Sequence, residues 1–283
     1  MAIRSLSDVN AAYESGRFHS QRYFKNASTN SGNWTDQSFS SGQPGYDARV
    51  GTANTFTPVI ATGNDAVWFP QIAAGQDRHL ESFELRFTRG APSGLSAILF
   101  DLVGYYPLID GDSTDTMLMD NTATLPRYQD GVGVIPVFIS YIAPSVQSGV
   151  ATMTYIGTDD VERSVTFNIF NTTATGGVVV SGANISGTSG SECNINVPTR
   201  GSSGVKQITS ITYLTPPSGL HCIYLIKPIA SVAGMETGVA VNKSLFPAMP
   251  KIPDGAALNL FTRQAGGTSA GSTVFGNFNF IWG

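Results

Sequence analysis

The stretch SFELRFTRG at residues 82–90 decides the fold class. Phe83, Leu85 and Phe87 alternate with polar residues, and this period of two is typical of a β-strand that is buried on one face. The same period recurs along the chain, in ERSVTFNIF (162–170), QITSITYL (207–214), HCIYLIKPI (221–229), ALNLFTR (257–263) and the closing FNFIW (278–282). The sequence therefore predicts an all-β protein.

Two further runs are apolar almost throughout, AILFDLVGYY at 97–106 and VIPVFISYI at 134–142. Such dense runs are expected of strands inside a core between two sheets. Turn residues separate the predicted strands, at 91–94, 129–131, 216–219 and 253–255. Short strands with turns at this spacing indicate a β-sandwich or jelly-roll-like body.

The composition excludes several classes of protein. The chain has 283 residues, of which 41% are hydrophobic and only 13% are charged, whereas an average soluble domain carries about 25% charged residues. The apolar content is too high for disorder, and the net charge of −4 argues against a nucleic-acid partner. No run reaches the roughly 18 apolar residues of a membrane span, and no leader peptide is evident, so we expect no membrane partner and synthesis in a cytosol.

Residues 1–54 are expected to form an extended N-terminal arm with one short helix, and residues 55–283 the β-sandwich body. The helix is predicted at 5–16, where Ser5 or Ser7 can cap it, Leu6, Val9 and Tyr13 share one face, and Gly16 can end it. Residues 26–54 are rich in Asn, Ser and Gly and bury little by themselves. The alternative is a helix packed on its own sandwich.

Residues 171–207 interrupt the strand pattern, because they are almost all small or polar. They form either a long exposed excursion or a linker between two β lobes, at 55–170 and 208–283. Cys193, in this stretch, could pair with Cys222, although two cysteines in a chain of this length do not indicate a disulfide-stapled domain.

Two serine motifs can be set aside as catalytic sites. Ser269 lies in a formal G-x-S-x-G match (267–271), but the match sits between two strands, whereas a nucleophile elbow needs a strand followed by a helix. Gly111-Asp112-Ser113 is similar to the GDS block of SGNH hydrolases. Those enzymes also have a late Asp-x-x-His, which this chain lacks.

Metal and phosphate sites are not predicted either. Asp110, Asp112 and Asp115 could supply oxygen ligands to Ca²⁺, but they miss the EF-hand spacing and are better explained as an acidic turn, as is Asp159-Asp160. The remaining candidates lack the spacing or orientation of a site, namely His19, His79, His221 with its neighbour Cys222, and the Gly201–Lys206 loop. We therefore predict no catalytic, cofactor-binding or metal-binding residues, no cofactor and no enzymatic activity.

Three segments carry a resemblance to a known family, namely MAIRSLSDVN (1–10) with YESGR (13–17), LPRYQDG (125–131), and PDG (253–255) through FGNFNFIWG (275–283). They resemble virion proteins of tailed bacteriophages, which are described as head-associated structural proteins. The resemblance implies a capsid decoration or cement protein on the capsid surface, assembled in the host cytoplasm. Its implied partners are the major capsid protein and further copies of itself, as a trimer or dimer.

Two other functions compete with this interpretation. One is a phage tail, baseplate or receptor-binding protein that binds glycans, for which Trp34, Trp68, Tyr105 and Tyr106 are candidate stacking residues, although the last three are better explained as core or interface residues. The other is a β-sandwich hydrolase, which would need a pair of carboxylates in a groove.

Overall fold

The computed structural model describes most of the chain. The described residues are 3–27, 34–47, 49–61, 66–88, 95–142, 148–170, 180–181, 195, 197, 199–235, 239–264 and 272–283. The elements, in chain order, are α1 (Leu6–Glu14), β1 (Phe18–Ala27), β2 (Trp34–Asp36), the 3₁₀ helix η1 (Gln37–Phe39), β3 (Gly42–Gln43), β4 (Thr57–Pro58), β5 (Arg78–Thr88), β6 (Leu95–Asp110), β7 (Met117–Leu118), β8 (Ile135–Ile142), β9 (Ser148–Gly157), β10 (Glu162–Phe170), β11 (Val180–Ser181), β12 (Val205–Thr215), β13 (Leu220–Met235), β14 (Ala240–Ser244), β15 (Leu258–Gln264) and β16 (Ser272–Trp282).

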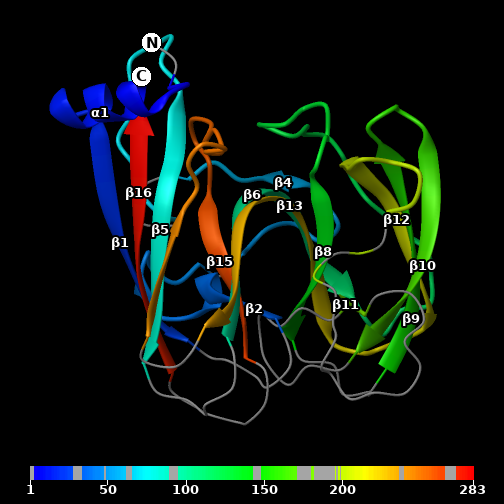
Figure 1. Ribbon diagram of the computed structural model, residues 1–283. Helices are drawn as coiled ribbons and strands as arrows, with labels where there is room; N and C mark the ends of the chain where they lie inside the picture. The colour runs from blue at the N-terminus through cyan, green and yellow to red at the C-terminus, as the bar shows by residue number, and fades with distance from the viewer. Residues whose placement is uncertain are drawn as a thin grey trace.

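The strands form three sheets that stand side by side as layers (Figure 1). The terminal sheet has the order β14-β5-β16-β1-β3, and it is on the left of the figure. The central sheet has the order β2-β15-β6-β13-β8, with β4 paired to β6. The third sheet, β11-β10-β9-β12-β7, is called the hydroxyl sheet below because of its outer face. The all-β prediction is confirmed, with one more layer than a simple sandwich has.

Both dense apolar runs lie in the central sheet, on β6 and β8, whereas the alternating runs are divided between the central sheet (β13 and β15) and the two outer sheets. Leu99 and Leu260 pack in the core toward the terminal sheet, whereas their neighbours Phe100 and Phe261 belong to the core toward the hydroxyl sheet. The central strands are therefore buried on both faces, and this explains the dense apolar run at 97–106. Strand β5 alternates because only one of its faces is covered.

A buried ion pair links the loop before β8 to the central sheet. Arg127, from the LPRYQDG run, donates to both carboxylate oxygens of Asp101 on β6, at 2.9 and 2.7 Å. It also donates to the carbonyl oxygens of Val59 and Leu102, and Asp101 accepts from the amide of Ala257. The Asp101 side chain is fully buried and that of Arg127 is 6% exposed. The pair therefore joins four chain segments inside the core.

The predicted helix is present, but a different face of it is buried. Ser5 caps α1 through a capping box with Asp8. Val9 and Ala12 are buried against the end of β16, whereas Leu6 and Tyr13 are 60% and 41% exposed. The prediction that Leu6 and Tyr13 lie on the buried face is wrong, because the helix presents Val9 and Ala12 to the sheet.

Residues 1–54 contribute to two sheets and do not extend away from the body. Strand β1 lies between β16 and β3 and pairs with β16 over its whole length. Strand β2 pairs with β15 of the central sheet. Of the two alternatives raised by the sequence, the structure shows the helix packed on its own body, since a ten-residue strand pairs with the chain's own backbone.

Strands from 55–170 and from 208–283 share the same sheets. β13 pairs with both β6 and β8, and β12 pairs with β9. The two regions therefore do not form separate lobes. Most of 171–207 lies outside the described residues, as does Cys193, the proposed partner of Cys222. Among the described residues, no helix is long and apolar enough to cross a membrane.

Candidate functional site

The outer face of the hydroxyl sheet carries threonine and serine side chains in rows. In one row, Thr152 of β9 lies opposite Thr166 of β10 and Thr212 of β12, and Thr116, just before β7, contacts Thr212. The hydroxyl oxygens are 2.9 Å apart for Thr152 and Thr166, and 2.8 Å apart for Thr116 and Thr212. Such cross-strand hydroxyl pairs stabilise a sheet without adding charge.

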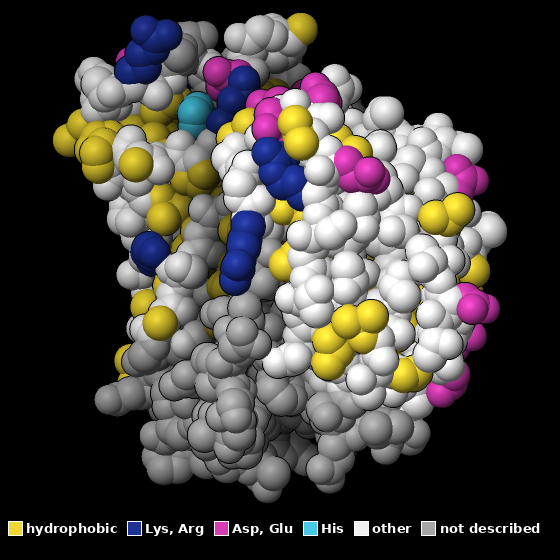
Figure 2. All heavy atoms as spheres, turned by 90° about the vertical axis from the view of Figure 1, so that its right-hand side faces the viewer, with side chains coloured by type: hydrophobic (Ala, Val, Ile, Leu, Met, Phe, Trp, Pro, Cys, Tyr) yellow, Lys and Arg dark blue, Asp and Glu magenta, His cyan; other side chains and the backbone are white. Residues whose placement is uncertain are grey.

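A second row follows the same geometry, with Thr154 between Ser164 and Ser210. Figure 2 looks onto this side of the molecule, where most of the surface is white and charged side chains are few. Two exposed leucines adjoin the rows, Leu118 of β7 and Leu214 of β12. The face offers hydroxyl groups and small apolar areas to a partner.

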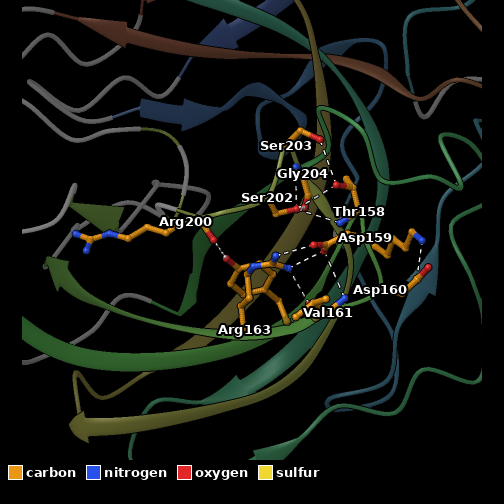
Figure 3. Close-up of polar contacts among 11 residues, drawn as sticks. Thr158, Asp159, Asp160, Val161, Arg163, Arg200, Ser202, Ser203 and Gly204 are labelled. Carbon is orange, nitrogen blue, oxygen red and sulfur yellow. Dashed lines mark hydrogen bonds and ion pairs between the residues drawn. The ribbon is translucent and has the colours of Figure 1, made fainter.

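The turn between β9 and β10 is held by a bidentate ion pair, drawn in Figure 3. Arg163 donates to both carboxylate oxygens of Asp159, each at 2.7 Å. These hydrogen bonds hold the pKa of the exposed Asp159 carboxyl well below its usual range. The Asp159 carboxylate also accepts from the amide of Val161, so the predicted acidic turn is present.

The same turn is tied to the start of β12 (Figure 3). The Ser202 hydroxyl accepts from the amide of Thr158 at 3.0 Å and donates to the carbonyl of Gly204 at 2.6 Å. Lys206 forms an ion pair with Asp160 at 2.6 Å. These contacts join the turn between β9 and β10 to the start of β12 at the rim of the hydroxyl sheet. They leave no nucleophile with a neighbouring base.

The acidic turn after β6 has a structural explanation. The Asp110 carboxylate accepts from the amide of Asp112, and the Ser113 hydroxyl accepts from the amide of Asp115. The side chains thus serve the backbone of the turn, as the sequence indicated. Among the described residues no group of three His, Cys, Asp or Glu side chains is placed to hold a metal ion. Ser269 lies outside the described residues.

His221 and Cys222 have different surroundings, because the side chains of neighbouring residues on a strand point to opposite faces of the sheet. The His221 ring is buried beside Phe138, and its Nδ1 is 2.8 Å from the Tyr213 hydroxyl. Burial lowers the pKa of His221 to about 4 and raises the pKa of the Cys222 thiol well above its usual value. Both groups are therefore neutral near pH 7, and Cys222 is a buried free thiol.

A buried polar cluster in the N-terminal region was not predicted from the sequence. Asp36 accepts from the Tyr224 hydroxyl at 2.9 Å and from the hydroxyl of Ser38 at 2.6 Å. The guanidinium of Arg49 donates to Tyr224 and pairs with Asp47. The only signal was the density of polar residues in 34–49, which indicated a loop of little burial. In the structure these groups are buried because they satisfy one another.

Of the aromatic candidates, Trp68 is on the surface. It is 50% exposed and lines a cavity of about 570 Å³, together with Arg78 and Asp254. Tyr105 and Tyr106 are buried and donate hydrogen bonds to Val50 O and to Asn121. Trp34 is half-buried against the core.

An exposed apolar patch lies on α1 and the start of β1, near both ends of the described chain (Figure 1). Leu6 and Tyr13 are two helical turns apart and so lie on the same side of α1. The rings of Tyr13 and Phe18 are 5.2 Å apart, and Phe18 is 49% exposed. These three residues are called the α1 patch below.

Comparison with known proteins gives weak similarities. No family model and no curated protein matches the chain. Among solved structures, the chain is similar to one of infectious bursal disease virus Gt strain, with a TM-score of 0.19 and 12% identity over 94% of this chain and 80% of that one. It is also similar to structures of T=1 particles derived from the virus (TM-score 0.20, 14% identity, 93% and 77% covered) and of its VP2 subviral particle (TM-score 0.19, 13% identity, 93% and 80% covered). TM-scores this low establish neither a family nor a shared fold.

Proposed function

We propose that this chain is a non-enzymatic virion structural protein, a decoration or cement protein that binds the outside of a phage head. The observation that carries the proposal is the α1 patch, three large apolar side chains left exposed at one end of the terminal sheet. Exposed apolar clusters on a folded protein commonly mark contacts with other proteins. Leu6 and Tyr13 lie within the N-terminal segments whose sequence resembles phage virion proteins, and Phe18 follows directly after them.

The rest of the surface suits an assembly subunit. The chain is poor in charge, and the hydroxyl sheet presents rows of uncharged groups. Subunits with little charge can approach one another without the desolvation of many ions that a charged interface requires. The proposed partners are the major capsid protein and neighbouring copies of this chain, in a closed dimer or trimer.

The test is co-sedimentation with undecorated phage heads, after the mass of the free protein has been measured by light scattering. We expect an oligomer that pellets with the heads at a fixed copy number. Leu6→Asp should abolish pelleting without changing the melting temperature, because Leu6 is 60% exposed and contributes little to the core. Deleting residues 2–25 is not a clean test, because it removes most of β1 from the terminal sheet.

The matched control is Ile142→Asp at the end of β8, where the side chain is 51% exposed and lies outside both the α1 patch and the hydroxyl sheet. It should pellet like the wild type. A monomeric wild-type protein that stays in the supernatant contradicts the decoration function. Heads that bind Leu6→Asp as well as the wild type contradict the role of the α1 patch.

A further inference from the structure

We propose that the cavity beside Trp68 binds a neutral saccharide ring. The cavity has a volume of about 570 Å³, within the range of about 300–1,000 Å³ that is usual for small-molecule sites. One wall is the segment before β5, with Trp68, Phe69 and Gln71, and the other is the turn before β15, with Asp254. The inference goes beyond the head-binding function and does not depend on it.

Arg78 of β5 connects the two walls. Its Nη2 donates to the carbonyl of Pro70 at 2.6 Å and to the carboxylate of Asp254 at 3.1 Å. Its guanidinium carbon lies 4.3 Å from the centre of the Phe69 ring, which packs on Phe280 in the core. The walls are therefore joined by a buried cation and by the backbone hydrogen bond from Val67 to Leu258, so the cavity is formed before a ligand arrives.

The burial of Arg78 is unfavourable as a purely structural arrangement. The residue is 1% exposed, and its Nε and Nη1 have no hydrogen-bond partner in the structure. A buried cation with unsatisfied donors destabilises a fold, and such groups are retained where they serve a site. We assign Arg78 the role of a positioning residue, which holds Asp254 at the mouth of the cavity.

The groups that face the cavity fit a sugar better than an ion or an apolar molecule. The Asp254 side chain is 78% exposed and can accept hydrogen bonds from ligand hydroxyls. Trp68 offers a half-exposed indole to the C–H face of a ring, and Gln71 adds an amide. Arg78 and Asp254 cancel in charge, so an anion would gain little attraction and would meet a carboxylate. An apolar ligand would displace water from that carboxylate and offer it no hydrogen bond in return, so that its bond from Arg78 would be left to compensate.

The test uses saturation-transfer NMR on the full chain with the methyl α-glycosides of D-glucose, D-galactose, D-mannose and N-acetyl-D-glucosamine. We expect at least one glycoside to receive saturation and to shift the fluorescence of Trp68. Trp68→Ala and Asp254→Asn should each weaken binding at least tenfold, whereas Trp68→Phe should retain part of it. The matched control is Tyr46→Ala, which removes an exposed aromatic residue outside the cavity and should bind like the wild type.

Three results would overturn the inference. They are the absence of transfer to all four glycosides, transfer that persists in Trp68→Ala and Asp254→Asn, and binding of sulfate or acetate in place of the glycosides. Thermal melts of each variant separate a lost site from a lost fold. Failure here leaves head binding untouched, because Leu6→Asp and Trp68→Ala change different surfaces.

Discussion

The buried pair of Asp101 and Arg127 should contribute far more to stability than the exposed pair of Asp159 and Arg163, although both are bidentate. In Asp101→Asn, the guanidinium of Arg127 keeps its place in the core but loses the charge that compensates it. Removing one partner of a buried pair costs about 3–5 kcal/mol. For an m-value of about 3 kcal/mol/M, this lowers the urea midpoint by roughly 1–2 M.

The comparison variant is Asp159→Asn, in which Arg163, 22% exposed, can still be reached by water. Its midpoint should remain within the error of the measurement, because solvent screens exposed pairs. A third variant, Asp101→Leu combined with Arg127→Met, should recover much of the loss, since it removes both charges from the core. Equal midpoints for Asp101→Asn and Asp159→Asn would refute the claim that burial sets the strength of these pairs.

Two more predictions concern His221 and Gly204. Burial lowers the pKa of His221 to about 4 from 6.5, so the unfolded chain binds this proton first as the pH falls. Stability should therefore decrease between about pH 6.5 and pH 4, by about 3 kcal/mol in total. Urea unfolding across this range should show the decrease, and an unchanged slope in His221→Gln would contradict it. In Gly204→Ala, the new Cβ would lie 2.1 Å from the carbonyl oxygen of Gly131. This clash between the new Cβ and a backbone oxygen should destabilise the fold by about 1–3 kcal/mol. A melting temperature equal to that of the wild type would show that the segments at Gly131 and Gly204 can move apart freely.

The dense apolar runs carry more information about the layers of the fold than the alternating runs do. Alternation does not distinguish the sheets, because 82–90 and 162–170 lie in outer sheets while 221–229 and 257–263 lie in the central one. The dense run at 97–106 is that of a strand covered on both faces. The dense runs alone are therefore the signal of a sheet that lies between two others. A sandwich of two sheets would give alternation in nearly every strand.

The N-terminal region could not be predicted from local patterns, because its burial depends on distant partners. Asp36 is buried through Tyr224, and Gln37 through a hydrogen bond to Thr262. Polar side chains whose partners lie some two hundred positions away resemble those of a solvated loop. The cavity beside Trp68 could not be predicted for the same reason. Arg78 and Asp254 are far apart in the sequence, and neither lies in a recognisable motif, but they form a hydrogen bond in the structure.

The position of β16 between β5 and β1 has a consequence for the synthesis of the protein. During translation, β1 and β5 emerge early, but the strand that joins them is made only after residue 271. Until then the terminal sheet has two separate parts, and apolar residues such as Phe83 and Tyr23 have no complete surface to pack on. Non-local pairing of this kind folds slowly and exposes strand edges to aggregation. The nascent chain is therefore expected to depend on chaperones until β16 has left the ribosome, and ribosomes stalled before residue 272 should carry protease-sensitive chains.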